Sequence, residues 1–135
     1  AQFAGVIQLQ QSGAPQSVAA GSTFTVTLLW QALGTPATDY TSFVHLIGAD
    51  GQQLIGSDHA PAGDRLPTRL WRANDQIVDQ HLFSLPASAS TGSYAVWVGL
   101  YESASGGSLR LPISDAAGNP SGDGVVQIGT ITVSR

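Results

Sequence analysis

The sequence contains no cysteine. This absence excludes disulfide bonds, a thiolate nucleophile, iron–sulfur clusters and cysteine-ligated zinc. Redox roles are therefore excluded, whereas the cellular compartment stays open.

Lysine is also absent, so five arginines are the only strongly basic side chains, and nine acidic residues bring the net charge to −4. A nucleic-acid-binding protein needs clustered cations that displace the counterions of phosphates. Only Arg65, Arg69 and Arg72 lie near one another in the sequence, and the apolar residues between them indicate a solvated loop edge. We therefore expect no nucleic-acid partner.

Long apolar runs are missing as well, and none approaches the roughly 18 residues that a membrane-spanning helix requires. We expect no membrane insertion by this chain itself. Hydrophobic residues nevertheless make up 42% of the sequence and charged residues only 10%, which provides the apolar surface that a folded core needs. A length of 135 residues suits one core, and we predict a single domain over residues 1–135.

Glycine and proline are frequent, at 16 and 7 residues, which favours many turns and few long helices. Residues 23–30 alternate threonine with Phe24, Val26, Leu28 and Trp30, and this period of two predicts a half-buried strand. Residues 93–101 repeat the pattern: the alternate residues from Tyr94 to Leu100 are expected to face inward.

Turn signals separate the other predicted strands. Asp50-Gly51 lies between two apolar runs and predicts a hairpin over residues 41–57 with a type I′ turn. A bulge at Gly129 would bring the apolar residues of 126–133 onto one face. Phe3, Ile7 and Leu9 indicate an opening strand.

The segment between Pro67 and Pro86 is ambiguous, because its apolar residues also approximate a helical stripe. We favour a loop to about residue 75 and a strand over 76–85, since Asn74-Asp75 is turn chemistry. The whole pattern predicts an all-β fold: a single antiparallel two-sheet β-sandwich, Ig-like or jelly-roll-like, of about seven to nine strands. Tyr94, after Gly92 at a strand start, resembles the tyrosine corner of Ig-like sandwiches.

An ordered series of short motifs carries a family resemblance. The series comprises Asp39 to Leu46, Asp50-Gly51, Asp58, Pro61, Trp71, Ile77, Asp79, and Tyr94 to Tyr101. It resembles the extracytoplasmic C-terminal β-sandwich domain of bacterial mannosyltransferase-like membrane glycosyltransferases, especially those of Chloroflexi. The resemblance covers about residues 5–133. It implies an accessory domain without chemistry of its own, because the catalytic machinery of that family belongs to the membrane portion. Asn74-Asp75 stands where the family commonly has Gly-Glu.

Histidines and carboxylates offer two weak metal hypotheses. His45, Asp58, Asp79 and His81 would form a ligand set if they converged, but no HxH or HExxH spacing is present. We interpret His45 and Asp79 as hydrogen-bonded residues at the core edge and Asp58 as a turn cap. Asp115, Asn119 and Asp123 could offer oxygens to calcium, but their spacing does not match an EF-hand. We expect no resident metal or cofactor.

Catalytic patterns are weaker still. No G-x-S-x-G motif occurs, and no serine is paired with a histidine by spacing. Glu102 is the only glutamate, and no segment suggests a cleft with paired carboxylates. We therefore expect no enzymatic activity.

Aromatic residues give the most informative surface signal. Trp97 and Tyr101 are four apart on one predicted strand and share its outer face, where sugar rings stack on aromatic platforms. Arg110 or Asn119 would supply hydrogen bonds at the rim. The alternative is that the loop carrying Trp71, or the 109–113 segment, folds over the rings and makes a second small core. The candidate carbohydrate-binding residues are Trp97, Tyr101, Trp71 and Arg110.

Three functions remain open from the sequence. The first is a non-catalytic, extracytoplasmic accessory or interaction module, secreted or at the cell surface. The second is a carbohydrate-binding module, and the third is a self-assembling filament or surface-layer subunit that pairs through exposed sheet edges. A glycan or a protein is the expected partner, and the oligomeric state stays open.

Overall fold

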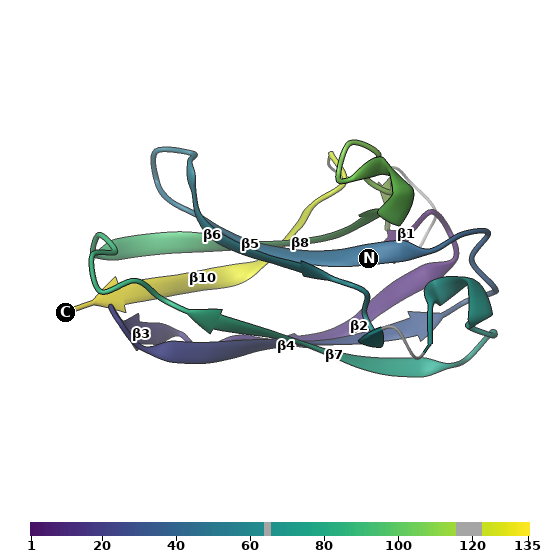
Figure 1. Ribbon diagram of the computed structural model, residues 1–135, viewed down its shortest axis with the longest axis horizontal. Coiled ribbons are helices and arrows are strands. Elements are labelled where there is room, and N and C mark those ends of the chain that lie inside the picture. The colour runs from purple at the N-terminus through teal and green to yellow at the C-terminus, as the bar shows by residue number, and fades with distance from the viewer. Residues whose placement is uncertain (64–65, 116–122) are drawn as a thin grey trace.

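Two β-sheets pack face to face in the computed structural model, which describes residues 1–63, 66–115 and 123–135 (Figure 1). The first sheet has the order β7 (Gln76–Ser84), β4 (Thr23–Ala32), β2 (Ile7–Gly13), β1 (Gln2–Phe3), β9 (Ile113–Ser114). The second has the order β3 (Ser17–Ala19), β10 (Val126–Ser134), β8 (Gly92–Glu102), β5 (Tyr40–Ile47), β6 (Gln53–His59). The predicted all-β two-sheet sandwich is confirmed.

The strands that exceed the predicted number are short. β1, β3 and β9 hold only two or three residues each, so their sequences carry too few alternations to be recognised. Neighbouring strands are antiparallel except for β3, which pairs in parallel with β10. No helix in the described ranges has the length and hydrophobicity that crossing a membrane requires.

The inner faces of both sheets share one hydrophobic core. The predicted inward residues of β4 and β8 are buried, from Phe24 to Trp30 and from Tyr94 to Leu100. Trp30 is fully buried and meets the ring of Phe3 edge-on, with centroids 5.2 Å apart. Burial of one such side chain contributes about 1.5–3 kcal/mol relative to exposure, so the alternating pattern explains which face of β4 and of β8 points inward.

The hairpin of β5 and β6 forms as predicted, but its turn differs. The Gly48 N–H donates to the carbonyl of Gln52, so the loop is longer than a two-residue type I′ turn. Gly51 has a φ of 81°, whereas Asp50 is not among the residues with positive φ. The carboxylate of Asp50 instead accepts a hydrogen bond from the Gln52 N–H. Side-chain bonding by Asp50 thus replaces the left-handed conformation that we expected there.

The ambiguous segment between Pro67 and Pro86 forms a loop followed by a strand, as we favoured. A single 3₁₀ turn, η2 (Thr68–Leu70), precedes it, and the chain reverses at Asn74, whose φ is 76°. The Arg72 N–H donates to the carboxylate of Asp75 and closes this turn. β7 then pairs along its whole length with β4 without a register shift.

The two remaining sequence signals are confirmed. The Tyr94 hydroxyl donates to the Ser90 carbonyl at 2.7 Å, as a tyrosine corner does. The pairing of β10 with β8 shifts register between Gln127 and Gly129, so a bulge lies where we expected one. Val126 and Ile128 pack against the core on one side of the bulge, and Ile131 and Val133 are buried on the other.

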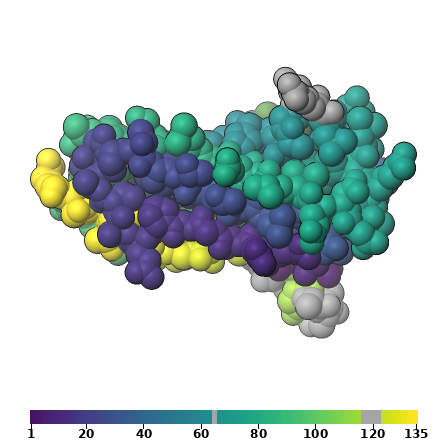
Figure 2. All heavy atoms as spheres, turned by 90° about the horizontal axis from the view of Figure 1, so that it is seen from below, coloured from purple at the N-terminus to yellow at the C-terminus, as the bar shows by residue number. Residues whose placement is uncertain are grey.

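The edges of the two layers determine where the polar clusters lie. β6 ends the second sheet and β7 ends the first, and these two edge strands contact each other. The outer face of the first sheet, over β2, β4 and β7, is the face turned toward the viewer in Figure 2. The contact between β6 and β7 and the outer face of the second sheet hold the residues discussed next.

Candidate functional site

The outer face of the second sheet carries four side chains from three neighbouring strands and one from the segment after β8. We call this set the outer platform: His45, Asp58, Trp97, Tyr101 and Arg110. Strand alternation places His45 directly opposite Trp97, on the face away from the core. Two loops project beyond this face: the turn between β5 and β6, and the segment around η3 (Ser103–Ser105) (Figure 1).

Glycines let the rings lie close to the sheet. His45 lies over Gly56 of β6, where an added Cβ would come within 2.8 Å of its ring. Phe43 lies across the backbone of β8 at Gly99, where an added Cβ would be 2.5 Å from Phe43 Cε2. The imidazole of His45 and the ring of Phe43 are 4.7 Å apart. The glycines therefore make room for a continuous ring surface on this face.

Asp58 ties the polar groups of the outer platform together. His45 Nε2 lies 3.1 Å from Asp58 Oδ1, and the Tyr101 hydroxyl donates to Asp58 Oδ2 at 3.0 Å. Burial raises the pKa of Tyr101, and the hydrogen bond and charge of Asp58 raise it further. Our interpretation of His45 as a hydrogen-bonded residue is confirmed, with a carboxylate as its partner. The interpretation of Asp58 as a turn cap is wrong, because its carboxylate bonds to His45 and Tyr101.

Arg110 covers the centre of this surface. Its guanidinium lies 5.0 Å from the centroid of the Phe43 ring, a cation–π distance, and Phe43 is only 1% exposed. The 109–113 segment therefore does fold over an aromatic ring on this face, but that ring is Phe43. Trp97 and Tyr101 stay half-buried, so each keeps part of its ring at the surface.

Trp71 does not join the other carbohydrate candidates. Its side chain is fully buried in the core, and its indole N–H donates to the Leu66 carbonyl at 3.0 Å. A ring without exposed surface offers no face for stacking. The prediction that Trp71 belongs to the carbohydrate-binding residues is therefore wrong, because the loop that carries Trp71 turns inward to cap the core.

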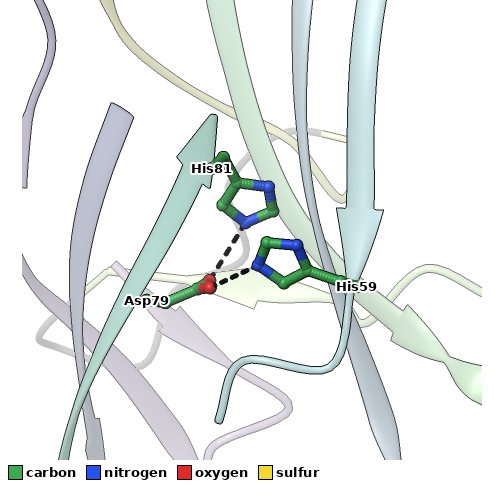
Figure 3. Close-up of side chains that lie close together, drawn as sticks. All are labelled: His59, Asp79 and His81. Atoms are coloured by element: carbon green, nitrogen blue, oxygen red, sulfur yellow. Dashed lines mark hydrogen bonds and ion pairs between the residues drawn. The ribbon is translucent and has the colours of Figure 1, made fainter. Parts of the chain in front are cut away.

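A second cluster lies inside the sandwich, between β6 and β7. Asp79 and His81 point inward from β7, and His59 points toward them from the end of β6 (Figure 3). We call His59, Asp79 and His81 the inner cluster; its ligand atoms lie within 4.8 Å of one another. The four residues His45, Asp58, Asp79 and His81 therefore do not converge: the first two belong to the outer platform.

Asp79 is the centre of the inner cluster and is fully buried. Its Oδ2 accepts hydrogen bonds from the Trp30 indole at 3.0 Å and the Ser42 hydroxyl at 2.6 Å. His81 Nε2 lies 3.1 Å from Oδ2, and His59 Nε2 lies 2.7 Å from Oδ1. Burial raises the pKa of Asp79, but the bonds and charge of its neighbours, His81 foremost, bring the pKa below its ordinary value.

The inner cluster contains serine, histidine and aspartate without the geometry of a nucleophilic triad. Ser42 Oγ and Asp79 Oδ2 both approach the same nitrogen of His81, at 2.9 and 3.1 Å. In a triad the carboxylate orients the opposite nitrogen of the imidazole. Ser42 is also fully buried, so its hydroxyl serves the hydrogen-bond network rather than a substrate.

The sequence held signals for the inner residues that we did not use. Asp79 and His81 share the parity of Ile77 and Phe83, so two polar residues occupy core positions of one strand, and a buried polar residue is the informative exception. His59 lies opposite Ser42 in the hairpin. Its inward direction follows from this pairing. The predicted two-residue turn gives the same partners, because the register shift between Leu46 and Ile47 offsets the longer turn.

The calcium hypothesis is not tested by the structure. Asp115 and Asp123 are exposed, and Asn119 lies outside the described residues. The set Asp115, Asn119 and Asp123 therefore stays a prediction.

Comparisons with known proteins concern the fold. No protein-family model matches the chain, and no curated protein sequence matches it. Among solved structures, it is similar to a Niemann-Pick type C2 protein from the Japanese carpenter ant, with a TM-score of 0.50 and 7% identity over 87% of this chain and 79% of the other. It is also similar to the C-terminal domain of Wzt, with a TM-score of 0.51 and 15% identity over 96% and 70% of the two chains. Both likenesses support the β-sandwich fold.

Proposed function

We propose that this chain is a non-catalytic, extracytoplasmic β-sandwich module that binds a glycan on its outer platform. The observation that carries the proposal is the fixed carboxylate beside exposed aromatic surface. Asp58 is held by His45 and by the Tyr101 hydroxyl, and Trp97 lies opposite His45 on the same face. Sugar hydroxyls need preorganised polar partners, and the C–H faces of sugar rings need an aromatic surface.

The spacing of the two rings suits an extended ligand rather than a single small molecule. Trp97 and Tyr101 are four residues apart on β8, about 14 Å at the usual strand rise. Between them lie Phe43 and the guanidinium of Arg110, which adds donors at the middle of the surface. An oligosaccharide that runs along β8 would meet ring, carboxylate and guanidinium in turn.

Two further parts of the proposal rest on other support. The absence of catalysis is supported by the complete burial of the side chains of Ser42, Asp79 and His81. The extracytoplasmic setting, and a role as accessory domain of a membrane glycosyltransferase, are supported by the ordered motifs from Asp39 to Tyr101 that resemble that family. The likeness to the C-terminal domain of Wzt supports the sandwich fold of such an appended domain.

A glycan array with three purified proteins tests the proposal. The wild-type chain is expected to bind at least one class of glycan, and Trp97→Ala to weaken that binding about tenfold, because aromatic stacking contributes up to about 1.5 kcal/mol. Leu82→Ala is the matched control: it removes an exposed side chain from the first sheet and should leave binding unchanged. A blank array for the wild type, or equal losses in both variants, would refute glycan binding on this face.

One observation favours self-assembly as a second function. β7 is a nine-residue edge strand with no bulge against β4, and its outward residues Val78 and Leu82 are 63% and 71% exposed. The outward residues of β7 carry no charge, so one usual protection against edge-to-edge pairing, charged side chains on the exposed face, is missing. We propose antiparallel pairing of β7 strands as the contact. Light scattering should show concentration-dependent dimers or polymers that Val78→Lys abolishes; a monomer at high concentration would refute this function.

A further inference from the structure

The inner cluster combines two imidazoles and one carboxylate from two different sheets. His59 comes from the edge of the second sheet, and Asp79 and His81 come from the edge of the first. Both histidines direct Nε2 at the same carboxylate (Figure 3), at 2.7 Å from Oδ1 and 3.1 Å from Oδ2. Their rings are stacked, with centroids 3.9 Å apart.

From this geometry we propose that His59, Asp79 and His81 bind a divalent transition-metal ion of the zinc type. Two imidazole nitrogens with one carboxylate oxygen are borderline-soft and hard donors together, a set that suits zinc and its neighbours. Calcium and magnesium prefer sets made of oxygen atoms alone. The inference does not rest on the outer platform or on glycan binding.

The distances require only a small rearrangement. In a tetrahedral site with bonds of about 2.0–2.1 Å, ligand atoms are roughly 3.3 Å apart. The two nitrogen–oxygen separations are 2.7 and 3.1 Å, and the ligand atoms all lie within 4.8 Å of one another. Shifts of about 0.2 to 1.5 Å bring the three atoms to that spacing. His59, which is partly exposed at the end of β6, can supply most of this movement.

The surroundings of the inner cluster match those of a built metal site. A ligating histidine normally uses its second nitrogen in a hydrogen bond that fixes the ring. His81 does so: its Nδ1 lies 2.8 Å from Ser57 Oγ. The Trp30 indole and the Ser42 hydroxyl both donate to Asp79 Oδ2, which leaves Oδ1 directed at His59. The ligands are thus oriented by partners from both sheets.

His59 also provides access. Its side chain is 39% exposed, whereas those of Asp79 and His81 are fully buried. An ion can therefore reach the inner cluster along the exposed side of His59, and a water molecule on that side can supply the fourth ligand. Because the ligands come from both edge strands, a bound ion would link the two sheets where no backbone hydrogen bonds join them.

Because a bound ion would link the two sheets, it should stabilise the fold, and this gives the first test. The test uses the full chain after dialysis against a chelator. Zinc added at 100 times its Kd should raise the Tm by roughly 10 °C, with one ion bound per chain by calorimetric titration. Magnesium at the same concentration should leave the Tm unchanged. If saturating zinc neither binds with one-to-one stoichiometry nor raises the Tm, the proposal is wrong.

Matched histidine variants locate the site. His59→Gln should weaken zinc binding by roughly 100-fold or more, because the loss of even an outer-shell partner costs about 10–100-fold. His59 is partly exposed, so this variant is expected to fold. His45→Gln removes the corresponding histidine of the outer platform, which also faces a carboxylate, and should bind zinc as the wild type does. Loss of binding in His45→Gln, or unchanged binding in His59→Gln, would overturn the proposal.

Ser57→Ala provides a test without removing a ligand. The variant deletes the partner of His81 Nδ1 and should lower zinc affinity about 10–100-fold while the one-to-one stoichiometry is kept. Unchanged affinity would show that His81 is not oriented for a metal, and would contradict the assignment of His81 as a ligand.

Discussion

Asp79→Ala is expected to be the most informative test of the interior. The carboxylate is fully buried, and four donors are directed at it: the Trp30 indole, the Ser42 hydroxyl and the two histidines of the inner cluster. Ala removes the acceptor for all of them at once. Ser42, Trp30 and His81 are themselves fully buried, so they cannot turn to water instead.

The loss of stability in Asp79→Ala follows from the number of donors that lose their acceptor and from their burial. A buried donor left without a partner costs about 1–3 kcal/mol, and removal of one member of a buried charged network costs about 3–5 kcal/mol. We therefore expect Asp79→Ala to lower the free energy of unfolding by about 3–5 kcal/mol. Asp79→Asn keeps an oxygen for the three buried donors and presents its amide to His59, so a loss of about 1–2 kcal/mol is expected.

Urea unfolding at pH 7, followed by tryptophan fluorescence, measures these differences. Asp58→Ala is the matched control, because Asp58 also contacts a histidine and a second side chain. Its side chain is 40% exposed, so its loss should cost no more than about 1 kcal/mol. The reasoning is refuted if Asp79→Ala is as stable as Asp58→Ala, or lies within 1 kcal/mol of the wild type.

The same variants test the sign of the pH dependence. The pKa of Asp79 is lowered in the folded state, so its ionised form stabilises the fold. That contribution is present above the ordinary carboxyl pKa of about 3.9 and is lost as the pH falls through the lowered value. His59 and His81 face the same carboxylate, so the comparison is confined to acid pH. The stability difference between wild type and Asp79→Asn should shrink from pH 5 to pH 3; a growing difference would contradict the assignment.

Two further predictions concern the packing of β8. Gly99→Ala should lower the free energy of unfolding by about 1–3 kcal/mol, because the new Cβ would overlap Phe43. Gly129→Ala is the control: nothing lies within 4 Å of its Cβ, so its free energy of unfolding should stay within about 0.5 kcal/mol of the wild type. Equal urea midpoints for the two variants would argue against the packing of Phe43 over β8. Tyr94→Phe should cost about 1 kcal/mol by removing the hydrogen bond to Ser90, measured by the same unfolding assay, and a variant as stable as the wild type would show that the tyrosine corner contributes nothing.

The sequence predicts the fold well where alternation is long. β4 and β8 are identified with their inward faces, because β4 offers five and β8 four buried residues of one parity. β7 is identified less directly, since Val78 and Leu82 are apolar yet point outward while Asp79 and His81 point inward. Hydrophobicity alone does not decide the inward face of this strand, because Ile77 and Phe83 are apolar on the other parity. Its inward face is set by pairing with β4, which is tertiary information.

The sequence predicts only part of the outer platform, because the rest depends on how the strands pair. Parity places Trp97 and Tyr101 on one face, which requires only the local sequence. That Asp58 bonds to both His45 and Tyr101 depends on the register of β6 against β5 and of β5 against β8. Trp71 lies in a loop without periodicity, so nothing in its neighbourhood indicates that the ring caps the core.

Asp58 and His59 show why the two candidate sites depend on the register of one hairpin. They are consecutive on β6 and point to opposite faces: Asp58 to the outer platform and His59 to the inner cluster. A shift of one residue in the hairpin register would exchange them, placing an imidazole outside and a second carboxylate beside Asp79. The turn closed by Gly48 and Gln52 and the register shift between Leu46 and Ile47 together set that register. Without the shift, Asp58 and His59 would exchange faces, so this irregularity of the hairpin determines the chemistry of both faces.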